Sequence, residues 1–125
     1  MKLLTEEQRA ALLRNGRLRR QFEELPEDDE NGKAEPDFLP VVKLFTPDAS
    51  CTWLLTELDP EDPDIAFGLC DLGMGCPELG SVSLAELESV RGKLGLPVER
   101  DLHFSTTKTI SAHADEARAA GRIKA

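Results

Sequence analysis

Four short segments that read as strands follow one another along the middle of the chain, and the first of them is rich in β-branched and aromatic residues. They span residues 41–46, 51–58, 65–72 and 79–83, with connections of only a few residues between them. Connections this short join antiparallel neighbours, because a parallel crossover needs a dozen residues or more. The pattern therefore predicts an antiparallel meander of four strands, and residues 98–104 are a candidate fifth strand.

The first 25 residues carry helix signals. Thr5 and Gln8 have the spacing of a capping box, which predicts a helix that begins at about Glu6. The pair Asn15-Gly16 is expected to end or kink this helix, because both residues tolerate a left-handed backbone. Apolar residues then recur at helical spacing as far as residue 25, which predicts another turn or two of helix.

Two more helices are expected after the meander. Ser83 and Glu86 repeat the capping-box spacing, so a helix should follow the fourth strand and end at Gly92. The Ala-rich residues 111–120 could form a small helix as well. Together these elements predict an α+β fold with a mainly antiparallel sheet of four to five strands, an N-terminal helical segment and a helix after the fourth strand.

A chain of 125 residues has the length of a single domain. We divide it into a helical N-terminal segment (1–25), an acidic linker (26–38), a sheet core with its helix (39–107) and a tail that could be helical (108–125). Within the linker, residues 27–37 hold six acids, one lysine and no large apolar side chain. Such a segment cannot bury enough surface to offset its ordering entropy, so we expect it to be mobile.

Alternation along the strands predicts which side chains share a face. In the second strand, Trp53, Leu55 and Glu57 are expected on one face. In the third strand, the large apolar side chains are separated from the small ones: Ile65, Phe67 and Leu69 on one face, and Ala66, Gly68 and Cys70 on the other. We expect the large side chains to point toward the helices and the small face to be more exposed.

Charge is distributed unevenly along the chain. Between Leu44 and Val90 there is no lysine or arginine, and ten carboxylates give this acidic block a charge of −10. They are Asp48, Glu57, Asp59, Glu61, Asp62, Asp64, Asp71, Glu78, Glu86 and Glu88. The remaining 78 residues carry +1, which leaves −9 for the whole chain. This balance disfavours direct binding of nucleic acid or of an anionic membrane surface.

Two hypotheses for the acidic block stay open. One is a solvated surface that keeps the protein soluble. The other is a recognition face for a basic protein, such as one that normally holds DNA, because an array of carboxylates attracts arginine and lysine side chains as phosphates do. The loop acids Asp59, Asp62 and Asp64 would then be contacts. The same loop lacks the Gly-centred spacing of a calcium-binding EF-hand.

Carboxylates near strand ends point to a second class of function. Glu57, Glu78, Glu99 and Asp101 could converge on a divalent metal in a hydrolase or nuclease, or act as an acid and base pair. Alternatively, Arg100 pairs with one of them structurally. No serine or cysteine with a histidine base at suggestive spacing accompanies them. We therefore assign no catalytic residue, no metal ligand and no cofactor.

Other residues also have both structural and functional interpretations. Trp53, the single tryptophan, is expected in the core rather than as a stacking platform. The N-terminal arginines could contact phosphates, but we favour a solvated helix face that also answers the acidic block within the chain: Arg9, Arg14, Arg17, Arg19 and Arg20. The three cysteines are expected to be reduced thiols in the core, and no apolar run resembles a signal or a membrane span. These features predict a cytoplasmic protein.

Several motifs occur in a specific order over residues 39–105. They are Val42-Lys43-Leu44-Phe45-Thr46-Pro47, Thr52-Trp53-Leu54 with Glu57, Phe67-Gly68, Glu78-Leu79-Gly80 with Ser83-Leu84-x-Glu86-Leu87-Glu88, and Leu96-Pro97-Val98-Glu99-Arg100-Asp101-Leu102. Together they resemble a family of small bacterial proteins labelled only as a domain of unknown function. The resemblance implies genes carried on plasmids and conjugative elements, often near anti-restriction and DNA-processing genes, with no settled activity.

We therefore expect a non-enzymatic binding module, associated with mobile genetic elements, that presents an acidic face to a basic protein. The matched motifs and the acidic loop together supply its candidate binding residues: Trp53, Glu57, Asp59, Asp62, Asp64, Glu78, Glu99, Arg100 and Asp101. A metal-dependent hydrolase or nuclease that uses the clustered carboxylates is the alternative.

Overall fold

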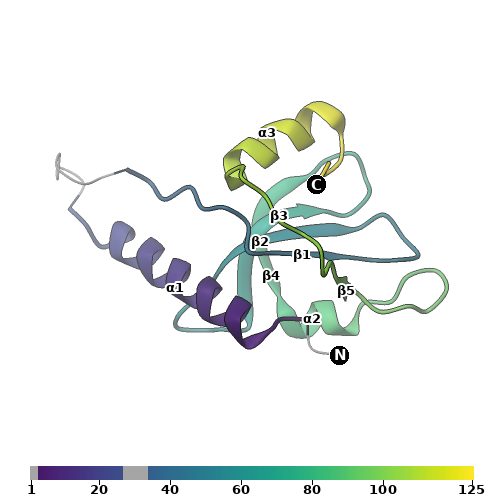
Figure 1. Ribbon diagram of the computed structural model, residues 1–125, viewed down its shortest axis with the longest axis horizontal. Coiled ribbons are helices and arrows are strands. Elements are labelled where there is room, and N and C mark those ends of the chain that lie inside the picture. The colour runs from purple at the N-terminus through teal and green to yellow at the C-terminus, as the bar shows by residue number, and fades with distance from the viewer. Residues whose placement is uncertain (1–2, 27–33) are drawn as a thin grey trace.

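The computed structural model describes residues 3–26 and 34–125, and it consists of one open sheet with helices on both of its faces (Figure 1). Its elements are α1 (Glu6–Glu23), β1 (Val42–Phe45), β2 (Thr52–Leu58), β3 (Ile65–Asp71), β4 (Glu78–Ser83), α2 (Leu84–Ser89), β5 (Glu99–Arg100) and α3 (Ile110–Ala120). The predicted α+β fold, with its N-terminal helix and the helix after the fourth strand, is confirmed.

The sheet has the strand order β4-β3-β2-β1-β5, and every pair of neighbours is antiparallel. Strands β1 to β4 form the predicted meander, and β5 returns to pair with β1 on its free side. The fifth strand is only two residues long, because the chain turns directly after it: Asp101 Oδ1 accepts a hydrogen bond from the His103 N–H at 2.9 Å. One edge of the sheet is therefore very short, and the other is the six-residue β4.

Helix α1 is continuous through Asn15-Gly16, so the prediction that this pair ends or kinks it is wrong. The predicted capping box at Thr5 and Gln8 is present. Gly16 is a close-approach residue, since a Cβ there would lie 1.8 Å from the carbonyl oxygen of Leu58. Asn15 Nδ2 donates to the carbonyl oxygen of Thr56 at 2.9 Å. The pair therefore docks α1 onto the end of β2.

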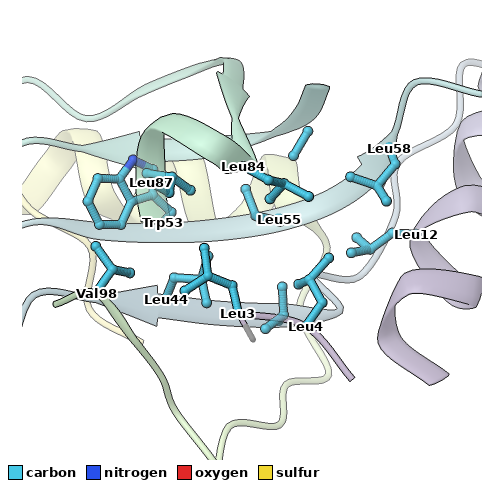
Figure 2. Close-up of a cluster of buried hydrophobic side chains, with 12 residues drawn as sticks. Leu3, Leu4, Leu12, Leu44, Trp53, Leu55, Leu58, Leu84, Leu87 and Val98 are labelled. Carbon is cyan, nitrogen blue, oxygen red and sulfur yellow. The ribbon is translucent and has the colours of Figure 1, made fainter. Parts of the chain in front are cut away.

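The main core lies on the face of the sheet that α1 and α2 cover. Trp53, Leu55 and Leu58 of β2 pack there with Leu12 of α1 and with the apolar side of α2 (Figure 2). Trp53 is only 3% exposed, which confirms its expected place in the core. A smaller cluster on the opposite face joins Leu54 and Leu69 to α3. Burial of these side chains is the main force that holds the helices on the sheet.

The expectation that the small face of β3 is the more exposed one is wrong. Ala66 and Gly68 are buried, whereas Ile65 and Phe67 on the other face are only half-buried. Leu55 lies opposite Gly68, and Trp53 lies opposite Cys70, across the β2–β3 ladder. The small side chains of β3 therefore leave room for the large ones of β2, and the main core forms on that face.

Residues 34–38 form neither helix nor strand and contact both α1 and α3. The Phe38 carbonyl accepts from the Ile110 N–H at 2.8 Å, and Asp37 Oδ1 accepts from the Ser111 N–H at 3.1 Å. The predicted mobile linker thus has hydrogen bonds to α3 in its described part, and residues 27–33 lie outside the described residues. The predicted C-terminal helix is present as α3, and α2 ends at Ser89, before Gly92.

All three cysteines are free. Cys51 and Cys70 are half-buried and pack against the main core, but Cys76 is exposed, so the prediction of a core position is wrong for Cys76. Burial raises the pKa of the Cys70 thiol. Within residues 3–26 and 34–125, no helix is both long enough and apolar enough to cross a membrane.

Candidate functional site

A cleft of about 750 Å³ opens between α1, residues 35–37, the start of α3 and the strands β3 and β4. We call it the α1–α3 cleft. Its apolar lining includes Phe22, Ile65, Phe67, Leu79 and Ile110. Its charged lining consists of five carboxylates (Glu23, Glu35, Asp37, Glu57 and Asp59) and two guanidinium groups (Arg19 and Arg20). The cleft therefore combines an apolar surface with an excess of negative charge.

Glu57 reaches this cleft because β2 is irregular at one point. The pairing between β2 and β3 shifts register between Leu55 and Glu57. In a regular strand these two residues would share a face, but the irregularity separates them. Leu55 joins the main core, whereas Glu57 lies opposite Phe67 and lines the cleft. The expectation that Trp53, Leu55 and Glu57 share one face is therefore wrong.

Arg19 connects three parts of the chain inside the cleft. Its Nε lies 3.2 Å from Glu57 Oε2, its Nη1 lies 3.1 Å from Glu35 Oε1, and its Nη2 donates to the Pro36 carbonyl at 3.2 Å. Burial alone would lower the pKa of Arg19, but hydrogen bonds and attraction from Glu57 and Glu35 outweigh it and raise that pKa. Arg19 thus stays charged and holds α1, β2 and residues 35–36 together.

Arg20, the next residue on α1, pairs with the acidic loop after β2. Its Nη2 lies 3.4 Å from Asp59 Oδ1, and its Nη1 donates to Glu61 Oε1. The hydrogen bond to Glu61 raises the pKa of Arg20. The interpretation that the N-terminal arginines answer the acidic block within the chain is confirmed for Arg19 and Arg20.

Other members of the acidic block also hold the backbone in place. Asp64 accepts from the Ala85 N–H at 2.9 Å and from Ser83 Oγ at 2.6 Å, and the bond from Ser83 lowers the pKa of Asp64. Asp48 Oδ2 accepts from the Leu94 N–H at 2.6 Å. Asp71 is buried and accepts from the Ile123 N–H at 2.9 Å. Much of the block is therefore structural, while Asp62, Glu78, Glu86 and Glu88 are exposed.

Glu57, Glu78, Glu99 and Asp101 do not meet, so the metal site proposed for these four carboxylates is not formed. Glu78 begins β4 and Glu99 begins β5, at opposite edges of the sheet. Adjacent strands are about 4.8 Å apart, so four steps separate these edges by roughly 19 Å. Asp101 pairs instead with Lys43, at 3.5 Å between Nζ and Oδ2. In the described part of the chain, no group of three or more His, Cys, Asp or Glu residues could hold a metal ion.

Of the nine candidate binding residues, the structure places two, Glu57 and Asp59, in the cleft. Trp53 is in the core, Asp62 and Asp64 lie in the loop before β3, and Arg100 lies in β5. The sequence interpretation missed Phe22, Phe67, Leu79 and Ile110, because each resembles an ordinary core residue. It had placed Arg19 on a solvated helix face.

The fold and the cleft define a class: an α+β protein with an open antiparallel sheet and an ion-paired, acidic cleft between its first and last helices. The chain belongs to the family described as protein of unknown function (DUF2958), whose model matches residues 3–124. No curated protein and no solved structure matches it. The expected membership of a domain-of-unknown-function family is confirmed.

Proposed function

We propose that the protein is a non-enzymatic binding module whose α1–α3 cleft receives a basic segment of a partner protein. The observation that carries this proposal is the excess of five carboxylates over two guanidinium groups around an apolar lining. Lysine and arginine side chains fit such a surface, because their aliphatic stems pack on apolar groups while their charged ends reach carboxylates.

The two arginines of the cleft leave its outer carboxylates accessible. Arg19 pairs with Glu57 and Glu35, and Arg20 pairs with Asp59 and Glu61. Glu57 and Asp59 are the more buried of these four acids. Glu23 is exposed, and the Glu35 side chain is 75% exposed although it contacts Arg19. A cationic partner would therefore meet Glu23 and Glu35 first, and the net attraction would depend on salt.

The partner we propose is a basic, DNA-binding protein met in the cytoplasm. Support comes from the resemblance to proteins encoded on plasmids and conjugative elements, because neighbouring genes on such elements commonly encode DNA-processing proteins. Binding through carboxylates would use the same arginines and lysines with which such a protein holds phosphates.

The test uses an arginine- and lysine-rich peptide as the probe, titrated into ¹⁵N-labelled protein at low salt. We expect amide shifts at Glu23, Phe67 and Leu79, and weaker binding as salt rises. The double variant Glu23→Lys/Glu35→Lys should weaken binding about tenfold, if each reversed charge costs roughly 0.7 kcal/mol.

A matched control changes the net charge equally at two exposed acids outside the cleft. It is the double variant Glu99→Lys/Asp115→Lys. We expect it to weaken binding much less, since neither residue lines the cleft. Equal losses in the two double variants, or no shifts at cleft residues at low salt, would show that the cleft is not the binding site.

A further inference from the structure

The two edges of the sheet differ in how they are protected. Proteins commonly guard an edge strand by making it very short, or with lysine, proline or a β-bulge, because unpaired backbone groups attract other strands. The edge strand β5 is two residues long. The edge strand β4 has six residues, contains no lysine or proline, and pairs with β3 without a register shift. Strand β4 therefore offers an unguarded edge of about 20 Å.

The hydrogen bonds around β3 establish which backbone groups of β4 point outward. The Asp59 N–H donates to the Ile65 carbonyl at 2.9 Å, so Ile65 directs its backbone toward the β2 side. The Leu84 N–H donates to the Asp64 carbonyl at 2.8 Å, on the β4 side. Because bonding alternates along an antiparallel ladder, Gly80 and Val82 bond to β3. The N–H and C=O groups of Leu79 and Ser81 consequently point away from the sheet.

The same two residues of β4 also line the α1–α3 cleft. Leu79 lies opposite Leu69, and Ser81 lies opposite Phe67, on the face of the sheet that carries Glu57. A strand added next to β4 would send every second side chain to this face, toward the cleft. The open edge and the cleft are thus two parts of one surface.

Charge around this edge selects the kind of strand that fits it. Strands β3 and β4 and helix α2 contain no lysine or arginine, and Glu78, Glu86 and Glu88 are exposed. A second copy of the chain would bring another −9 charge to the same surface, which opposes self-pairing. A strand rich in lysine or arginine would be attracted.

We infer that the basic segment of the partner binds as an added β-strand along the outer edge of β4, with alternate side chains in the α1–α3 cleft. This inference rests on the proposed function and specifies its binding mode. Main-chain hydrogen bonds to Leu79 and Ser81 supply the affinity, and the carboxylates around the cleft select basic side chains.

The first experiment compares two forms of one probe, a heptapeptide of alternating arginine and valine. One form has an ordinary backbone, and the other is N-methylated at alternate residues on the edge that would face β4, which removes backbone donors without changing charge. We expect the ordinary form to slow amide hydrogen exchange at Leu79 and Ser81 at least tenfold at saturation. The methylated form should bind at least tenfold more weakly and give no such protection.

The second experiment places proline at an outward-facing position. Ser81→Pro removes an N–H that the β3–β4 ladder does not use, so the variant should keep its fold and lose the peptide's strand pairing. Val82→Pro is the matched control, which tests whether the backbone groups of β4 point as inferred. The Val82 N–H is part of the β3–β4 ladder. This control should be strongly destabilised.

The outcomes separate the inference from the proposed function. If both peptide forms shift the cleft resonances equally, the cleft binds basic peptides but strand addition is wrong. If neither form shifts them at low salt, the proposed function fails as well. If sedimentation shows a dimer without peptide that Ser81→Pro abolishes, the edge is occupied by a second copy and the inferred occupant is wrong.

Discussion

At the scale of single residues, Gly16 shows how a residue typical of helix ends can have a different purpose. Nothing within the chain's first 25 residues distinguishes a glycine that ends a helix from one that permits close packing. Here the Leu58 carbonyl lies where a Cβ would be, with the Pro60 ring also 3.3 Å from that position. Absence of a side chain is therefore needed for α1 to reach β2, and this contact positions one wall of the cleft.

We predict that Gly16→Ala destabilises the protein, although alanine favours helix by about 1 kcal/mol over glycine. The added methyl would clash with backbone atoms that cannot rotate away, and overpacking of this kind costs about 1–3 kcal/mol or more. Urea unfolding followed by circular dichroism measures the free energy of unfolding. Gly80→Ala is the control, since nothing lies within 4 Å of its added Cβ. A more stable Gly16→Ala protein would show that the contact yields easily.

At the scale of elements, a small apolar cluster holds α3 on the sheet, and α3 also carries a buried titratable side chain, His113. His113 is 6% exposed, and its Nε2 lies 2.8 Å from Thr106 Oγ1. Burial lowers the pKa of His113 below its ordinary 6.5; Lys108 lowers it further, and Glu116 opposes this shift. The folded protein therefore holds His113 neutral at a pH where the unfolded chain begins to bind a proton.

We predict that the free energy of unfolding falls as the pH drops below about 6.5, because the unfolded state takes up a proton at His113 before the folded state does. His113→Gln should flatten the stability profile between pH 6.5 and the lower folded pKa. Urea midpoints measured across this range provide the test. His103→Gln is the matched control, because this histidine is exposed. Equal slopes in wild type and His113→Gln would contradict the prediction.

At the scale of the whole molecule, carboxylates both line the cleft and make structural contacts. Hydrogen bonds from Ser111, Ser83 and Lys108 lower the pKa values of Asp37, Asp64 and Glu116 respectively. A depressed carboxylate pKa stabilises the folded state above the ordinary value, which is 3.8 for Asp and 4.5 for Glu. This contribution disappears as the pH falls through the folded pKa values.

We predict that the urea midpoint falls between pH 4.5 and more acidic conditions, as these three carboxylates are protonated. The triple variant Asp37→Asn/Asp64→Asn/Glu116→Gln should be less stable than wild type at pH 6 and should lose less stability on acidification. Wild type and variant should therefore converge at low pH. Parallel profiles would show that other carboxylates cause the acid sensitivity.

The sequence by itself determined the local structure of the chain. The cap at Thr5, the cap at Ser83 and the short connections of the meander were predicted correctly, because each depends on residues that are close in sequence. The interpretation of Arg19 and Arg20 as answering the acidic block was also correct. That inference needed only opposite charge.

Only the tertiary structure decided which acids line the cleft and which accept hydrogen bonds from the backbone of loops. The Arg19–Glu57 and Arg20–Glu61 contacts join residues 38 and 41 positions apart, and the direction of Glu57 depends on an irregularity in the β2–β3 pairing. Register and helix docking are set by packing between distant segments, where a shift of one residue moves a side chain to the other face. The charge of −10 was therefore readable from the sequence. That the cleft takes only Glu57 and Asp59 from this block, and Glu23, Glu35 and Asp37 from outside it, was not.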